Sequence, residues 1–186
     1  MTVLCLVELD GTGAADASLR ALTFARDVAA PGGQLAAVVF GEAGALAGEA
    51  PAGEALAAYG VTDAYVVEPA QLAGYAPLAW ARVLAGLVSP TGADAVLAAG
   101  TDRGSEVMAH LGALTGLPMA ANCVSAARSG PGPDGAGPWQ IVRQRWAGLL
   151  LEDAVLELSP VLATVATDAV APVPADAPAT LTVHAH

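Results

Sequence analysis

The feature that most constrains the fold of this chain is an alternation between two kinds of segment in its first 115 residues. Four apolar runs have the length of strands, at residues 3–8, 35–40, 63–68 and 93–99. Four segments have apolar residues at helical spacing, at residues 16–30, 52–59, 76–88 and 105–115. Strands that are apolar throughout and alternate with helices are typical of a parallel sheet covered on both faces. We therefore predict an α/β fold, a three-layer sandwich with a mainly parallel sheet.

The alternation stops after residue 118. Four further strands are expected, with no helix between them, at residues 119–127, 139–146, 149–158 and 161–167. Because consecutive strands with short links cannot be parallel neighbours, this third of the chain is expected to be antiparallel. The segment that follows is rich in Pro and Ala, and we expect a spacer that does not continue the sheet. The prediction is one domain at residues 1–167 and a linker at residues 168–186.

The size and composition fit a single soluble domain. A chain of 186 residues with 55% hydrophobic content can fill a core. No apolar run reaches the ~18 residues needed to cross a bilayer, so no membrane insertion is expected. The chain starts without basic residues and soon reaches Glu8 and Asp10, which indicates a first strand rather than a signal peptide. We expect a cytoplasmic protein.

The charge balance is strongly acidic. The chain has 7 arginines, no lysine and 18 acidic residues, which gives a formal net charge of -11. Such a chain is repelled by nucleic acids and by anionic membranes, so neither is expected as a partner.

No metal site is predicted. Cys5 and Cys123 lie in separate apolar runs, which indicates buried structural thiols. His110 stands alone in an expected helix, and His184 and His186 lie among the last three residues. The histidines therefore lack the spacing of metal ligands.

The stretch most suggestive of ligand binding is residues 98–122, which runs from a strand through the turn Gly100–Gly104 into a helix. Phosphate groups often bind at such a junction. A phosphate cradle normally uses several glycines, whereas this turn has only the two at its ends, and Asp102 would oppose a phosphate although Arg103 offsets it. A chain without lysine has no P-loop. We favour a strand-to-helix corner in which Thr101 or Asp102 caps the helix.

No catalytic residue is predicted. The sequence has no G-x-S-x-G motif and no readable nucleophile with its base. Glu152 and Asp153 are adjacent acids that would point to opposite faces of a strand, so they do not form a carboxylate pair. Their simplest interpretation is a solvated turn between two strands.

Arg143 and Arg145 are notable because they project from one face of an expected strand in a chain with few cations. Two interpretations stay open. They bind a partner's carboxylate or a cofactor phosphate, or they neutralise nearby acids. Trp139 and Trp146 flank them and are expected in core or interface packing.

Three stretches, in this order, resemble the N-terminal domain of the α subunit of electron transfer flavoproteins, the FixB-like family. They are VLCLVELDGTGAADASLRALTFARDVA, AAGTDRGSEVMAHLGALTGLPMAANCV and IVRQRWAGLLLEDAVL. In the third, Arg143, Trp146, Ala147 and Gly148 match the family's Arg-x-x-aromatic-Ala-Gly hairpin. The resemblance covers nearly the full length of the chain.

The sequence also departs from the family pattern. His110 stands where Arg is usual, Leu149 where Asn is usual, and Asn122 where Asp is commoner. The loop at residues 129–138 is longer and richer in Pro and Gly. The family's second α domain, with its FAD-contacting loops, would begin after the Pro/Ala spacer and is not part of these 186 residues.

The resemblance implies an adenine nucleotide alpha hydrolase-like, Rossmann-like fold and an electron carrier rather than an enzyme. Such heterodimers pass electrons from flavin dehydrogenases, including those of fatty acid β-oxidation, to a quinone oxidoreductase or another acceptor. FAD is held mainly by the second α domain against the β subunit. The resemblance therefore implies a scaffold domain that packs with the β subunit, with FAD in the complete heterodimer and no cofactor in this segment alone.

Two other functions stay open. One is a stand-alone adenine-nucleotide-binding domain of the universal-stress type, with its ligand at the ends of the first and fourth expected strands. The lack of a Gly-rich phosphate loop counts against it. The other is an independent hydrolase or transferase, for which no catalytic residue can be named.

Overall fold

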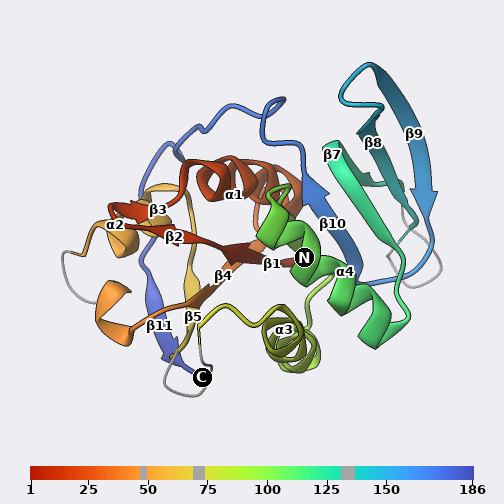
Figure 1. Ribbon diagram of the computed structural model, residues 1–186. Coiled ribbons are helices and arrows are strands. Elements are labelled where there is room, and N and C mark those ends of the chain that lie inside the picture. Colours follow the sequence, from red (N-terminus) through yellow and green to blue (C-terminus); the bar gives the residue numbers. More distant parts are fainter. Residues whose placement is uncertain (47–49, 69–73, 131–136) are drawn as a thin grey trace.

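The computed structural model describes residues 1–46, 50–68, 74–130 and 137–186 (Figure 1). The strands are β1 (Thr2–Val7), β2 (Leu9–Asp10), β3 (Gly13–Ala14), β4 (Gln34–Phe40), β5 (Asp63–Val67), β6 (Ala95–Ala99), β7 (Met119–Arg128), β8 (Trp139–Arg145), β9 (Leu150–Leu156), β10 (Val161–Val165) and β11 (Thr182–Ala185). The helices are α1 (Asp16–Ala29), the 3-10 helix η1 (Ala43–Leu46), α2 (Pro51–Ala58), α3 (Pro77–Thr91) and α4 (Asp102–Thr115).

The main sheet lies between two layers of helices. Its nine strands have the order β11-β5-β4-β1-β6-β10-β7-β8-β9, and β2 pairs separately with β3. The interior strand β1 shows how the layers form, because Val3 and Cys5 join the core under α1 and α2, whereas Leu4 and Leu6 join the core under α3 and α4. A strand buried on both faces must be apolar throughout. The predicted α/β sandwich with a mainly parallel sheet is confirmed.

The helix ends follow local sequence rules. Pro51 and Pro77 begin α2 and α3, where a missing backbone N–H costs no hydrogen bond. Gly92 and Gly116 follow α3 and α4 with φ angles of 62° and 71°, in the left-handed region that favours glycine. None of the described helices is long and apolar enough to span a membrane.

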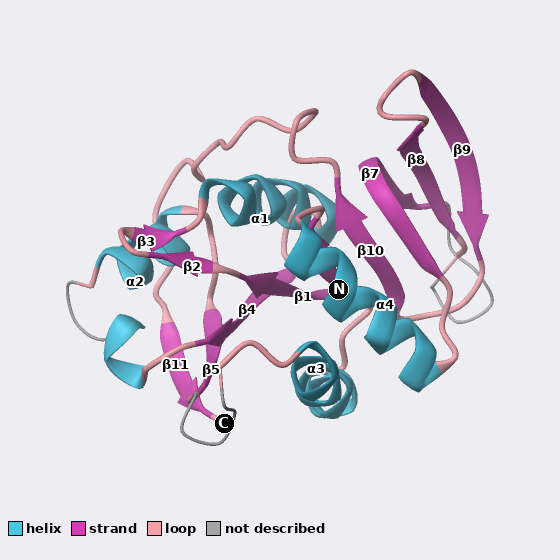
Figure 2. Ribbon diagram, in the orientation of Figure 1, coloured by secondary structure: helices cyan, strands magenta, loops and turns pink. Residues whose placement is uncertain are grey.

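The last third of the chain differs from the prediction in one strand. Strands β7, β8 and β9 form the expected antiparallel extension (Figure 2). Strand β10, however, is parallel to both of its neighbours, β6 and β7, so the antiparallel prediction for residues 161–167 was wrong. The short link after β9 forbids parallel pairing only between β9 and β10. The chain meets that limit by inserting β10 into the parallel part of the sheet.

The segment assigned to a spacer ends in a strand that the sequence did not predict. It first crosses α1, where Arg20 donates hydrogen bonds to the carbonyls of Val170 and of Thr167 just before the segment, and Arg26 donates to that of Val173. It then forms β11, which pairs in parallel with β5 at the edge of the sheet (Figure 1). A four-residue strand is too short to show a periodic signal. The prediction that residues 168–186 link to a second domain stays a prediction.

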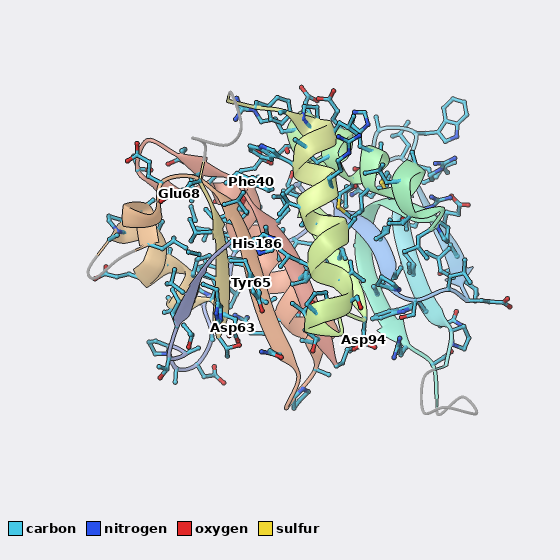
Figure 3. All side chains as sticks on the ribbon, turned by 90° about the horizontal axis from the view of Figure 1, so that it is seen from below. Phe40, Asp63, Tyr65, Glu68, Asp94 and His186 are labelled. Atoms are coloured by element: carbon cyan, nitrogen blue, oxygen red, sulfur yellow. The ribbon has the colours of Figure 1, made fainter. Side chains whose placement is uncertain are left out.

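A side-chain cluster fastens β11 to β5. His184 Nε2 lies 2.8 Å from Asp63 Oδ1, and its ring stacks on Tyr65 with centroids 4.9 Å apart. Asp63 and Tyr65 lie on β5 beside the C-terminal strand (Figure 3). Partial burial raises the pKa of Asp63, but hydrogen bonds from His184, Gln34 and Thr62 outweigh it and hold that pKa below its usual value. The carboxylate therefore stabilises this edge in its charged form.

Candidate functional site

The turn after β6 is a tightly packed corner. Thr101 Oγ1 accepts a hydrogen bond from the Gly104 N–H at 2.9 Å, which confirms the predicted N-cap of α4. A Cβ atom at Gly100 would lie 2.6 Å from the Val165 carbonyl oxygen, and one at Gly104 would lie 2.1 Å from that of Ala99. Both glycines therefore permit close backbone packing among β6, β10 and α4.

The N-terminus of α4 already has an anion from within the protein. The Thr101 hydroxyl donates a hydrogen bond to Glu8 Oε1 at 2.5 Å, which places this carboxylate at the start of the helix. Helix N-termini attract negative charge, and a second carboxylate, Asp102, lies in the first turn. Two carboxylates at this end oppose the approach of a phosphate. The arrangement favours the predicted corner over a phosphate site.

A cavity of about 230 Å³ lies beside this corner, at the carboxyl ends of β1, β4 and β5. Its lining includes the aromatic rings of Phe40, Tyr75 and Trp80 and the opposite charges of Glu8 and Arg103. Phe40 and Trp80 stack with centroids 4.1 Å apart, and the Arg103 guanidinium lies 5.1 Å from the centroid of Tyr75. This edge is where open parallel sheets bind ligands.

The cavity has no evident acid–base catalyst among its aromatic groups. The Tyr75 hydroxyl donates a hydrogen bond to Glu106 Oε2 at 2.7 Å. Burial and the neighbouring Glu106 carboxylate raise the pKa of Tyr75 to about 12, so the phenol stays protonated at neutral pH. The cavity is also smaller than the ~300–1,000 Å³ typical of sites for drug-sized ligands. It fits a small aromatic group rather than a whole dinucleotide.

A second hollow, of about 620 Å³, lies where the β8–β9 turn meets the end of the parallel sheet. Asn122, Arg145 and Asp168 line it together with the turn residues from Trp146 onward. Three of the four non-glycine residues with positive φ in the described chain lie here: Asn122 at 57°, Trp146 at 53° and Ala147 at 52°. Such backbone strain is uncommon and concentrates at functional sites. The hollow is therefore a second candidate site.

The two candidate arginines converge on one acid. Nε and Nη2 of Arg143 donate hydrogen bonds to the Glu152 carboxylate at 3.1 and 3.2 Å, and Arg145 Nε lies 3.1 Å from it. The hydrogen bond from Arg143 holds the pKa of Glu152 below its usual value. Neutralisation of a local acid thus accounts for Arg143. Arg145 is half exposed and lines the hollow, so binding of a second acidic group stays open for it.

The adjacent acids lie elsewhere than predicted, whereas Trp139 lies in the core as expected. Glu152 and Asp153 lie inside β9, so their interpretation as a solvated turn was wrong. They do face opposite sides, because Glu152 meets Arg143 and Asp153 is solvent-exposed. Trp139 is buried in the core, whereas Trp146 is 78% exposed at the turn.

Neither cysteine has the features of a reactive thiol. Cys5 and Cys123 are both buried and unpaired, and burial raises the pKa of each thiol to about 12. Within residues 1–46, 50–68, 74–130 and 137–186, no three His, Cys, Asp or Glu side chains are grouped so as to hold a metal ion.

Sequence analysis missed the aromatic cavity. Phe40 ends β4, whereas Tyr75 and Trp80 lie around the start of α3, and aromatic residues so far apart in sequence have no spacing that marks a site. The only available signal was that β4 and β5 end beside β1 in a parallel sheet, at its carboxyl edge. The second hollow, called the hairpin hollow below, is in contrast lined by residues 144–148, which belong to the contiguous motif from Arg143 to Gly148.

The fold is a doubly wound α/β domain with an antiparallel extension. A family model described as "Electron transfer flavoprotein domain" matches residues 3–186, and the chain therefore belongs to this family of electron carriers. The match does not distinguish an α from a β subunit. Comparison with curated proteins gave no match.

The family is FAD-containing, so the size and charge of each hollow can be compared with those of this dinucleotide. The aromatic cavity is too small, and its Glu8 carboxylate opposes a pyrophosphate. The hairpin hollow is large enough for part of the cofactor, but its lining offers one guanidinium, from Arg145, against the Asp168 carboxylate. Neither hollow fits a complete FAD molecule.

Proposed function

We propose that this chain is the N-terminal scaffold domain of an electron transfer flavoprotein α subunit. In this proposal it packs against a β subunit, and the complete heterodimer passes electrons from flavin dehydrogenases to a quinone oxidoreductase or another acceptor. The observation that carries the α assignment is the β8–β9 turn. There Arg143, Trp146, Ala147 and Gly148 reproduce the α-type hairpin motif within a chain of the matching family.

The exposed surface of that turn supports a contact with another subunit. Trp146 is 78% exposed and Leu149 83% in the turn, and Leu151 is 67% exposed in the first residues of β9 that follow it. Large apolar side chains gathered on one surface mark interaction sites, and tryptophan is the residue most enriched among those that dominate binding energy. The left-handed backbone at Trp146 and Ala147 fixes this turn in a strained conformation. The turn is therefore suited to insert into a partner.

FAD would be held mainly outside this chain. The poor fit of both hollows to a dinucleotide supports this part of the proposal. Residues 1–167 would form the base, and residues 168–186, which add β11 to its sheet, would lead toward the FAD-carrying domain.

Reconstitution tests the proposal. The chain is mixed with a β subunit and an FAD-loaded second α domain supplied as a separate polypeptide, and the complex is measured by light scattering and flavin absorbance. We expect a stoichiometric flavin-containing complex. Replacing Trp146 with Ala should weaken it by more than tenfold, whereas truncating another exposed apolar side chain to Ala, that of Leu114 on α4, should not. Absence of any complex with the unmodified chain would reject the proposal.

The aromatic cavity favours one alternative, an adenine-nucleotide-binding domain. Its stacked rings at the carboxyl edge of the sheet suit a planar base. A thermal-shift titration with ATP, AMP and FAD distinguishes the two functions, because a ligand that binds only the folded state raises the Tm. A clear shift with ATP, together with no complex with the β subunit, would favour the alternative.

A further inference from the structure

Strand β9 leaves one edge of the nine-stranded sheet open. It is the last strand in the sheet order and pairs only with β8 among the described strands. Figure 2 shows it as the outermost strand of the antiparallel extension. Alternate residues of an edge strand point their N–H and C=O groups away from the sheet, where another chain can bind them. With seven residues, β9 is long enough for such pairing.

One face of β9 has a distinctive side-chain order. Leu151, Asp153 and Val155 alternate along the strand and therefore lie on the same face. Leu151 is 67% exposed and Val155 54%, and Asp153 between them is also exposed. Among the described residues, Asp153 takes part in no ion pair, whereas Glu152 on the other face is paired with both nearby arginines. The strand contains no Pro, one of the residues that commonly protect an edge.

We propose that β9 binds an extended segment of another protein as an additional strand. Main-chain hydrogen bonds would supply the affinity, and the side chains of Leu151, Asp153 and Val155 would supply the specificity. The matching segment has an apolar, a basic and an apolar residue at alternate positions, so that a cation lies opposite Asp153. This inference concerns the strand edge and does not depend on the subunit assignment.

A second copy of the chain fits this edge poorly. In an antiparallel pair of β9 strands related by two-fold symmetry, the central residue lies opposite itself. That residue is Asp153, so two carboxylates would face each other. Each copy also has a formal net charge of -11. The facing carboxylates and the net negative charge both oppose pairing between two copies, and they favour a different, basic partner.

Peptide binding provides the test. The probe is the acetylated and amidated peptide TVTRTVT, and the comparison is TVTETVT, in which the central cation becomes an anion. Both are titrated into the isotope-labelled 186-residue chain while hydrogen exchange of the β9 amides is followed by NMR. We expect TVTRTVT to protect alternate amides of Leu150–Leu156 and to bind about 5- to 10-fold more tightly than TVTETVT, from the energies of opposite and like charges across strands.

Charge reversal separates this specificity from general attraction to an acidic protein. The variant Asp153→Arg should prefer TVTETVT. The control Asp176→Arg makes the same change of charge at an exposed position next to α2, on the other side of the molecule, and should keep the original preference. Circular dichroism checks that both variants are folded. The proposal is overturned if neither peptide protects β9, if protection occurs at β11 instead, if Asp153→Arg keeps the original preference, or if the chain alone dimerises through β9.

Discussion

Two glycines in helices provide a sharp test of the packing at the corner before α4. Gly104 lies in the first turn of α4, and Gly86 lies on the exposed side of α3. We consider Gly104→Ala and Gly86→Ala, which add the same methyl group to the same kind of secondary structure. At Gly86 the new Cβ meets nothing within 4 Å, whereas at Gly104 it lies 2.1 Å from the Ala99 carbonyl oxygen.

Gly86→Ala is expected to stabilise the chain, whereas the same change at Gly104 should give no gain or a loss. Alanine is about 1 kcal/mol more favourable than glycine inside a helix, so Gly86→Ala should raise the free energy of unfolding by about that amount. At Gly104 the start of α4 must move by more than 1 Å to reach ordinary contact, since the available distance is 2.1 Å and such contacts begin at 3.4 Å. Overpacking of this kind costs about 1–3 kcal/mol. The gain in helix propensity is common to both variants. The difference between their free energies of unfolding therefore measures the cost of overpacking.

Urea unfolding followed by circular dichroism measures both variants against the unmodified chain. The two free energies of unfolding should differ by about 1–3 kcal/mol, with Gly86→Ala the more stable. In a thermal scan of a protein this size, each kcal/mol corresponds to about 2–4 °C in Tm. Equal stabilisation by both alanines would show that Gly104 is not needed for close packing, and the interpretation of the turn as a corner would fail.

Three further predictions concern the cap, the C-terminal strand and the thiols. Thr101→Ala should lower the free energy of unfolding by about 1 kcal/mol in urea titrations, while Thr101→Ser, which keeps the hydroxyl, should cost less. Because the folded-state pKa of Asp63 lies below its usual 3.8, its contribution is present above that pH and is lost as the pH falls through the folded value. The protection factor of the His184 amide, which corrects for the intrinsic pH dependence of exchange, should therefore fall in acid more steeply than in Asp63→Asn. Cys5 and Cys123 should react with a thiol reagent at pH 8 only after denaturant is added, and rapid labelling of the native chain would contradict their burial.

The parallel part of the fold could be predicted from the sequence because burial on both faces leaves a strong pattern. Strand β1 is nearly all apolar, since its alternate residues enter two different cores. The identity of the neighbouring strands in the sheet leaves no such pattern in the sequence of a strand. Residues 161–165 are equally apolar beside β9 or between β6 and β7, and only the tertiary structure selects the second place. This explains why strand positions were predicted better than strand order.

A candidate site could be predicted only where its residues lie close together in the sequence. The residues from Arg143 to Gly148 are contiguous, so the sequence placed them on one hairpin. The alternation of Arg143 and Arg145 also placed both side chains on one face, where they meet Glu152. Which acid they bind depends on the register between β8 and β9, which the sequence does not show. The aromatic cavity depends on three elements that are brought together only by folding.

The use of the arginines bears on the proposed scaffold role. The chain has no lysine and only seven arginines, and six of them contact groups within the chain. They are Arg20 and Arg26 on the C-terminal segment, Arg103 over an aromatic ring, Arg128 on an aspartate, and Arg143 and Arg145 on a glutamate. Binding of a nucleotide pyrophosphate needs cations or free backbone N–H groups at one place, and the helix start best positioned for it, that of α4, faces Glu8 instead. A domain that uses its few cations to hold its own segments together is better suited to support a flavin-binding partner than to bind the flavin itself.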